Sequence, residues 1–206
     1  MLEPLLLQVI SLGFALLFVT AALHKFGDKP EFLRILEAYQ ILPRRMLPVI
    51  GKFVPMLEIS LGIAWLAVGL FSLQVELVSI ISTMLLTAYT LAIGINLMRG
   101  RRYIDCGCGF SSLAGFGGKA LSSAGIQQLS RGLLWRNGLL IVTSLLAAIP
   151  PAERELVLVD RLSLVAALVA VILLYGAFNQ LLANNNAIGA WRNSTPADGS
   201  GGGSHG

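Results

Sequence analysis

The sequence predicts an all-α membrane protein, a bundle of four to five transmembrane helices with an interfacial amphipathic helix after the first span. Three observations lead to this prediction. The 206-residue chain is 55% hydrophobic and only 13% charged, whereas soluble domains carry roughly 25% charged residues. Several apolar stretches approach the length of about 20 residues that a bilayer span needs. The segment between the first two stretches has the periodicity of an amphipathic helix.

Five apolar stretches are the predicted spans: residues 5–23, 53–71, 77–98, 133–149 and 162–182. Three of them carry no charge, and the second carries only Glu58. The stretch 133–149 is the shortest and has Arg136 near its start, so it makes the number of spans four or five. Residues 1–184 are therefore expected to form one membrane bundle, and residues 185–206, which end in a Gly/Ser-rich run, a disordered polar tail.

The connection after the first span, "KPEFLRILEAYQILP", is predicted to be a helix lying at the membrane interface. Helical spacing places four apolar side chains on one face: Phe32, Ile35, Leu36 and Tyr39. Pro30 suits the first turn, where no backbone N–H is needed. The connection is therefore expected to pack its apolar face toward the bundle or the lipid bilayer.

The basic residues predict the orientation in the membrane. One group lies between the first two spans: Lys25, Lys29, Arg34, Arg44, Arg45 and Lys52. A second lies between the third span and the start of the fourth: Arg99, Arg101, Arg102, Lys119, Arg131 and Arg136. The positive-inside rule places the N-terminus outside and both basic connections in the cytoplasm. The first apolar run lacks a positive flank, so no cleavable signal is expected. No basic run is interleaved with aromatics, which argues against a nucleic-acid partner.

The segment "RGRRYIDCGCGF", residues 99–110, contains the two cysteines of the chain, Cys106 and Cys108. Gly107 between them can adopt the backbone conformations that a disulfide between residues i and i+2 needs. Such a ring would be strained, and strained disulfides are the labile, catalytic kind. The nearby Arg99, Arg101 and Arg102 would favour the reactive thiolate, and Asp105 would oppose it. A redox-active dithiol is the favoured reading.

Two other readings of the cysteine pair stay open. Two thiolates can hold a soft metal, but a closed zinc site needs four ligands, and His24 and His205 are the histidines of the chain. No metal is therefore predicted. Alternatively, the cysteines are incidental small residues, since free cysteines are often inert. The sequence shows no Ser/His/Asp motif, phosphate loop or paired carboxylates, so any catalysis is expected to be thiol chemistry.

Polar residues inside predicted spans are further candidates. Glu58 is either functional, as intramembrane acids often are, or a structural partner for Lys25 at the end of the first span. Arg136 either reaches outward to lipid headgroups or lies with the positive helix N-terminus near the cysteine segment, where it would lower a thiol pKa. Tyr89 and Asn96 are expected to pack and hydrogen-bond between helices.

The strings "AALHKF", "AYQILP", "VPMLEISLG", "NLMRGRRYIDCGCGF" and "LLWRN" together resemble the MauE family, within the MauE/DoxX-like redox-associated membrane proteins. The resemblance covers about residues 5–182 and is most specific from the arginines through the cysteines. The family commonly reads Cys-Gly-Cys-Phe-Gly, whereas here Gly109 precedes Phe110. This difference leaves the cysteines intact and weakens the match of the residues after them.

The resemblance implies a multi-pass protein of the inner (cytoplasmic) membrane that is required for maturation of the methylamine dehydrogenase small (β) subunit. It implies thiol–disulfide exchange with a thioredoxin-like, MauD-type companion, through Cys106 and Cys108. The alternative is a non-enzymatic scaffold, or metal-holding partner, of the maturation machinery. No bound cofactor is expected from these residues, and a quinone is left open as the redox partner.

The predicted orientation conflicts with the implied client. The β subunit is periplasmic, while the positive-inside rule places the cysteines in the cytoplasm. Either the segment after residue 99 folds into the bundle and is reached from both sides, which irregular backbone lining a cavity allows, or the orientation is the reverse. The sequence leaves both open.

Overall fold

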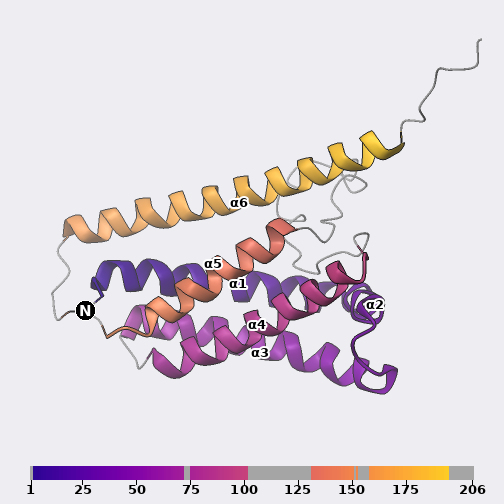
Figure 1. The fold of residues 1–206 in the computed structure, drawn as a ribbon. Coiled ribbons are helices and arrows are strands. Elements are labelled where there is room, and N and C mark those ends of the chain that lie inside the picture. The colour runs from indigo at the N-terminus through magenta and orange to yellow at the C-terminus, as the bar shows by residue number, and fades with distance from the viewer. Residues whose placement is uncertain (1, 72–74, 102–130, 151, 153–157, 195–206) are drawn as a thin grey trace, which may run out of the picture.

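The computed structural model describes residues 2–71, 75–101, 131–150, 152 and 158–194. Within them it is built from six α-helices and one short 3-10 helix (Figure 1). In chain order they are α1 (Pro4–Gly27), α2 (Lys29–Tyr39), η1 (Arg44–Met46), α3 (Leu47–Phe71), α4 (Glu76–Met98), α5 (Arg131–Ala147) and α6 (Leu158–Ser194). The predicted all-α class is confirmed.

Four of the helices are long and apolar enough to cross a membrane: α1, α3, α4 and α6. Helix α5, with 17 residues, is shorter, as the stretch 133–149 indicated. The number of four to five spans is therefore confirmed by length and composition. Helix α6 has 37 residues and is about 55 Å long, well beyond the roughly 30 Å of hydrocarbon. It continues past residue 184, where the polar tail was expected to begin, and residues 195–206 lie outside the described part.

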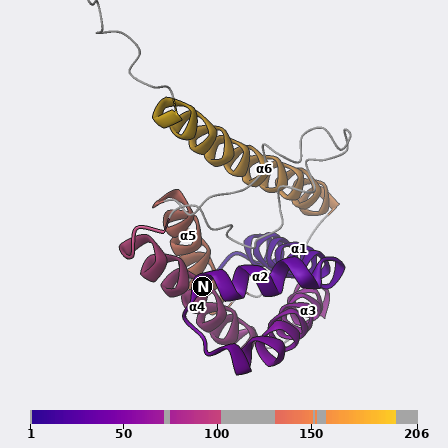
Figure 2. The ribbon, with the colours of Figure 1, turned by 90° about the vertical axis from the view of Figure 1, so that its right-hand side faces the viewer.

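Helices α1, α3, α4 and α5 form the bundle, and α6 lies to one side of it (Figure 2). The most extensive packing joins α1 to α3 and α4 to α5, while α6 packs mainly along α1. The amphipathic helix α2 crosses one end of the bundle against α3 and α1. Its predicted apolar face is confirmed, because Phe32, Ile35 and Tyr39 are buried and Leu36 is half-buried.

The seam between α1 and α3 is the centre of the apolar core. The ring of Phe14 in α1 stacks on Trp65 in α3, with centroids 5.0 Å apart and planes at 18°. Gly62 brings the two backbones together, since a Cβ there would lie 2.7 Å from Val19 Cγ2 and 3.3 Å from the carbonyl oxygen of Ala15. Small residues at helix contacts allow this approach within a membrane, where van der Waals packing drives association.

Buried polar side chains connect the bundle further along. Trp65 Nε1 donates a 2.8 Å hydrogen bond to Ser82 Oγ and so joins α3 to α4. Ser79 in α4 and Ser144 in α5 each donate from the hydroxyl to the backbone carbonyl of the other. Hydrogen bonds of this kind contribute roughly 0.6 kcal/mol each between membrane helices, so they refine the packing rather than drive it.

The two ends of the bundle are defined by contacts between distant segments. At one end, Leu2 donates to Pro150 O (3.0 Å) and Ala152 donates to Leu2 O (2.8 Å), which joins the chain start to the end of α5. At the other end, Arg99 Nη1 donates to Gln40 O (3.3 Å), which joins the end of α4 to the end of α2. Both basic connections therefore attach at the end opposite the N-terminus.

Candidate functional site

The predicted site residues divide into two groups. Outside the described residues lie Arg102, Asp105, Cys106, Gly107 and Cys108. Within them lie Lys25, Glu58, Arg99, Arg101 and Arg136. The cysteine segment lies in residues 102–130, between the end of α4 and the start of α5. The second group lies in the half of the bundle next to these two helix ends.

A buried ion pair joins α1 to α3 near this end. Lys25 Nζ lies 2.6 Å from Glu58 Oε1, and their side chains are only 5% and 1% exposed. Tyr89 in α4 donates from its hydroxyl to the same carboxylate oxygen at 2.7 Å. The contact between Lys25 and Glu58, one of the two interpretations of Glu58 that the sequence left open, is present, and Tyr89 makes the expected bond between helices. We call these three residues the ion-pair cluster.

Aromatic rings enclose the charged end of Lys25. The ammonium lies 5.5 Å from the ring centroids of both Phe32 and Tyr89. A cation at this distance from a ring face is attracted by the ring quadrupole, most strongly when water is excluded. Helix α2 thus closes the ion-pair cluster from the end of the bundle, because Phe32 belongs to its buried face. The amphipathic connection has a structural role that its periodicity alone did not reveal.

A second polar cluster joins α5 to α6 around Arg136. Its Nη1 donates to Asn179 Oδ1 at 3.0 Å, and its Nη2 donates to Asn137 Oδ1 at 3.2 Å. The guanidinium carbon lies 5.9 Å from the ring centroid of Tyr175. Arg136 is 5% exposed, so it is enclosed between helices rather than extended outward. We call these four residues the Arg136 cluster.

The arginines before the cysteines lie at the surface of the same end. Arg99 is exposed and bound to the backbone of α2 through Gln40. Arg101 is partly exposed, and its backbone N–H donates to Asn96 O at 3.0 Å. Gly100 between them has φ of 74°, a left-handed conformation that glycine adopts without strain. The chain therefore leaves α4 through a defined turn next to two cations.

Three polar groups gather at this end of the membrane bundle at different depths. Arg136 lies about 8 Å along α5 from its first residue. Glu58 lies roughly 15 Å along α3 from its start, and Tyr89 a similar distance along α4 from its end. An ion pair at such depth is costly unless it is well partnered, and intramembrane charges are functional candidates by default. The depth of Glu58 fits either of its two predicted roles.

Some of these contacts were missed from the sequence. Asn179 was not singled out, although an asparagine near the end of an otherwise apolar span is a usual sign of a contact between helices. Its Nδ2 donates to Tyr175 O at 3.0 Å, which orients its Oδ1 toward Arg136. The expectation for Asn96 differs from the structure, because its Nδ2 donates to Ala92 O of its own helix at 3.0 Å. An amide close to its own i−4 carbonyl competes with partners on other helices.

Fold and polar clusters together define a multi-pass helical membrane protein with buried charges at one end. A family model described as methylamine utilisation protein MauE matches residues 3–150, most of the chain and all of its cysteine segment. The chain therefore belongs to the MauE family.

Individual relatives carry the same description. The chain is 31% identical to the methylamine utilization protein MauE of Paracoccus denitrificans over 162 residues, 75% of this chain and 78% of that protein. It is 35% identical to the MauE of Methylophilus methylotrophus over 106 residues, 52% of this chain and 54% of that protein. It is 29% identical to the MauE of Paracoccus versutus over 154 residues, 74% of each chain. No solved structure gives a significant match.

Proposed function

We propose that this protein is a membrane component of methylamine dehydrogenase maturation, acting by thiol–disulfide exchange through Cys106 and Cys108. The observation that carries the proposal is the family match over residues 3–150, which includes the two cysteines of the chain. The proposed client is the small (β) subunit of methylamine dehydrogenase. The proposed redox partner is a thioredoxin-like, MauD-type protein.

The proposed exchange moves one disulfide. When the Cys106 and Cys108 thiols are oxidised to a disulfide, a disulfide of the partner is reduced to two thiols, and the reverse transfer balances in the same way. The first step is attack of a thiolate on a disulfide sulfur, which forms a mixed disulfide and releases the other sulfur as a thiolate. Cations near the attacking sulfur favour its thiolate form. Arg99 and Arg101 at the end of α4 support the proposal on this point.

The helical bundle supports the proposal as a rigid anchor for the cysteine segment. Helices α4 and α5, which bear its two ends, are joined by the reciprocal serine hydrogen bonds. We further propose the inner membrane as the location, with the N-terminus outside. The two basic connections attach at the same end of the bundle, which supports placing both on the same side of the membrane. The positive-inside rule makes that side the cytoplasm. Access of a periplasmic partner then needs the segment to be reached through the bundle.

Mixed-disulfide trapping tests the exchange. A single Cys→Ala change that removes the resolving thiol should accumulate a disulfide-linked species with the thioredoxin-like protein on a non-reducing gel. The other single change should give none. Ser60→Ala is a matched control, because Ser60 is exposed on α3 and donates to Met56 O of its own helix. Full maturation of the β subunit in both single cysteine variants would contradict the proposal.

The scaffold alternative predicts a different pattern. A Cys106→Ser/Cys108→Ser variant would then lose partner binding or stability without any mixed disulfide in the single variants. Stoichiometric copper or zinc in the purified protein would support a metal-holding role. Labelling of the native cysteines with an impermeant maleimide from each side of the membrane decides the orientation. Labelling from the cytoplasmic side is expected, and labelling only from the periplasm would overturn the proposed orientation.

A further inference from the structure

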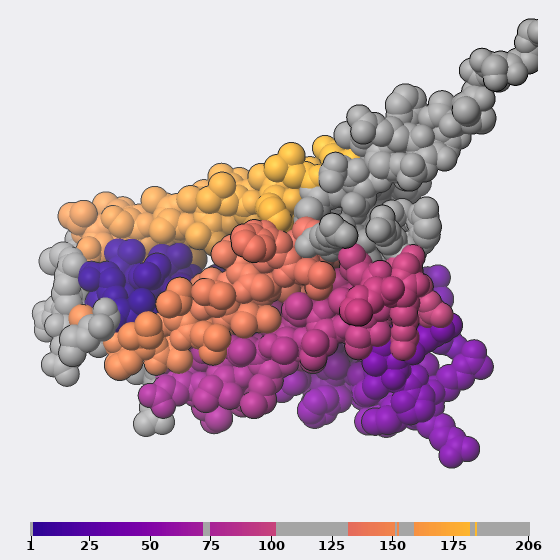
Figure 3. Space-filling view, viewed as in Figure 1, coloured from indigo at the N-terminus to yellow at the C-terminus, as the bar shows by residue number. Residues whose placement is uncertain are grey.

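The start of α3 lies beside α2, at the lower right of Figure 3 and at the bundle end opposite the N-terminus. Helices η1 and α3 together form one run, Arg44–Phe71, of 28 residues that is long and apolar enough to cross a membrane. The start of this run carries three cations, Arg44, Arg45 and Lys52. It is therefore a basic surface at one end of a candidate span.

Most cations of this basic connection already have a partner. The partnered cations are Lys25 with Glu58, Arg34 with Glu31, Arg44 with Glu37, and Lys29 with the ring of Phe26. Arg45 and Lys52 differ from them. Both are exposed, and among the residues that the structure describes no carboxylate lies within ion-pair distance of either. Their two positive charges are therefore available to an anionic ligand.

The two available cations lie on one face of the helix. Arg45 and Lys52 are seven residues apart, which is about two turns and about 10 Å along the helix axis. Side chains of a helix lean toward its N-terminus, and long basic side chains near a membrane surface extend toward the headgroups. Both effects direct the ammonium of Lys52 toward the level of Arg45. One headgroup that carries a phosphate can therefore contact both cations.

An exposed apolar stripe continues the same face toward the middle of the span. Its members are between 60% and 65% exposed, and they are Val49, Phe53, Met56 and Ile63. Spacings of three, four and seven residues keep them on the face of Lys52. The opposite face of α3 is buried, mainly against α1. The exposed face thus presents cations at its end and hydrocarbon contacts along its length.

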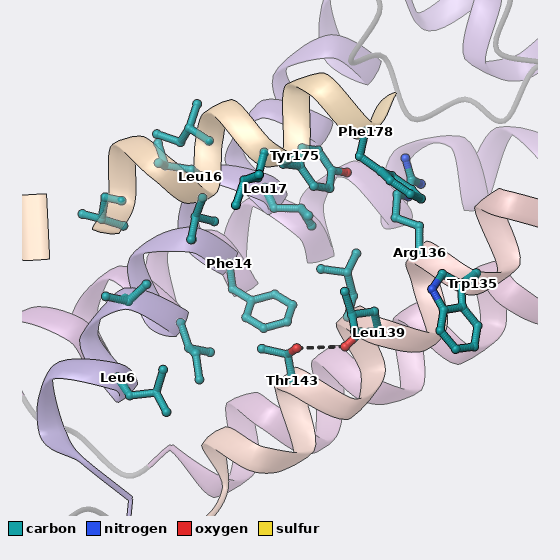
Figure 4. A pocket seen from close by; sticks show the side chains of 18 residues that line it. Leu6, Phe14, Leu16, Leu17, Trp135, Arg136, Leu139, Thr143, Tyr175 and Phe178 are labelled. Carbon is teal, nitrogen blue, oxygen red and sulfur yellow. Dashed lines mark hydrogen bonds between the residues drawn. The ribbon is translucent and has the colours of Figure 1, made fainter. Parts of the chain in front are cut away.

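The largest cavity of the described residues lacks this combination. It has a volume of about 590 Å³ and lies between α1, α5 and α6 (Figure 4). Apolar side chains such as Leu6 and Leu17 line most of it. The charged side chain in its lining, Arg136, is held by Asn137 and Asn179. The cavity therefore selects no particular headgroup, whereas the exposed face of α3 does.

From these features we propose that Arg45, Lys52, Val49, Phe53 and Met56 bind one anionic glycerophospholipid. We call these five residues the α3 lipid face. The phosphate of the lipid lies against the two cations, and an acyl chain runs along the apolar stripe. Charge complementarity selects the headgroup, because arginine binds phosphate oxygens through two donors and lysine binds them as a point charge. Binding involves no cysteine, so it is separate from the proposed thiol exchange.

A lipid bound at the α3 lipid face fixes the depth of α3 in the bilayer, because basic residues that flank a span act as interfacial anchors. Glu58 belongs to the same helix and is buried on its other face. The depth of the ion-pair cluster therefore follows the depth of the α3 lipid face.

Native mass spectrometry of the full chain, released from detergent, tests the binding. The probes are phosphatidylglycerol and phosphatidylcholine with the same acyl chains, so they differ in headgroup charge alone. We expect phosphatidylglycerol to form the first lipid adduct with at least tenfold higher affinity. Equal affinity for the two lipids would overturn the proposal. Glycerol 1-phosphate has the charge without the tails and should not compete, and effective competition by it would show an anion site rather than a lipid site.

Charge variants locate the headgroup. Arg45→Gln and Lys52→Gln should each weaken phosphatidylglycerol binding about fivefold, and together at least tenfold. Arg34→Gln/Arg44→Gln is the matched control, because it removes two cations from the same end that are already paired with glutamates of α2. This control should change the affinity less than twofold. An equal loss in the control would show that net charge alone attracts the lipid, and would contradict the site.

A second pair of variants locates the acyl chain. Phe53→Ser should weaken phosphatidylglycerol binding severalfold, because it removes apolar contact from the stripe. Leu70→Ser is the matched control, since Leu70 is 62% exposed on the same helix but near its other end. All these positions are exposed, so the midpoint of thermal unfolding should stay unchanged. Unchanged binding in both Phe53→Ser and Arg45→Gln/Lys52→Gln would reject the α3 lipid face.

Discussion

Helix α1 packs against α3 and against α6 in different ways. Against α3 it forms a filled seam, with Phe14 stacked on Trp65 and the Lys25–Glu58 ion pair at the end. Against α6 it encloses a cavity of about 590 Å³. Both neighbours are long and apolar, so hydropathy does not decide the difference. The position of small residues does, because Gly62 lies in a backbone contact while Gly13 faces open space.

The difference separates two tasks within one molecule. The α1–α3 seam, extended by α4 and α2, fixes buried charges in a well-packed region. The α1–α6 side leaves a cavity whose lining includes Arg136. Stability should therefore depend more on the seam than on the α6 side. The predictions below test this division from the largest expected effect to the smallest.

The largest effect is expected from breaking the ion-pair cluster. Glu58→Ala leaves the Lys25 ammonium buried, and removal of one partner of a buried pair typically costs about 3–5 kcal/mol. The midpoint of thermal unfolding in detergent, followed by circular dichroism, should fall accordingly. Lys25→Met/Glu58→Met removes both charges and should recover most of the loss. If that stable double variant still fails in maturation, Glu58 has a role beyond structure.

Closure of the α1–α3 approach should have the next largest effect. In Gly62→Leu the new Cβ would meet Val19 Cγ2 at 2.7 Å and the Val19 backbone nitrogen at 3.1 Å. Overpacking of this kind costs about 1–3 kcal/mol. Gly13→Leu, on the cavity side of α1, should change the unfolding midpoint much less. Equal destabilisation by the two leucines would mean that the two sides of α1 do not differ as described.

A smaller effect is expected at the hydrogen bond between α3 and α4. Trp65→Phe removes the donor to Ser82 Oγ and keeps most of the stacking on Phe14. The expected loss is about 1 kcal/mol, within the range measured for hydrogen bonds between membrane helices. Ser82→Ala should cost a similar amount, and the double variant little more than either. Additive losses in this double-mutant cycle would show that the bond does not couple the helices.

The smallest effect on stability is expected at the Arg136 cluster. Asn179→Leu removes the acceptor of Arg136 Nη1 and should lower stability by about 0.5 kcal/mol, because α6 adds little to the packed core. Loss of stability as large as that of Glu58→Ala would instead make α6 part of the core.

The sequence predicted much of the seam and little of the α6 side. The apolar runs and the buried face of α2 follow from length and periodicity. The contact of Lys25 with Glu58 was one of two interpretations that the cost of an intramembrane charge suggested. The choice of Glu58 as the partner of Tyr89 could not be predicted, because it depends on the position of α4 along α3. Asn179 and the cavity could not be predicted, because they depend on how far α6 stands from α1, which no local pattern encodes. The cysteines were assigned from chemistry and resemblance, and their role stays a prediction.

The redox state of Cys106 and Cys108 in living cells tests the central claim most directly. Rapid acid quenching followed by alkylation and mass spectrometry would measure the oxidised fraction, in cells that produce the thioredoxin-like partner and in cells that lack it. We predict a measurable disulfide between the two cysteines whose fraction shifts several-fold when the partner is removed. Two thiols that stay fully reduced in both strains, while the β subunit matures normally, would contradict the account.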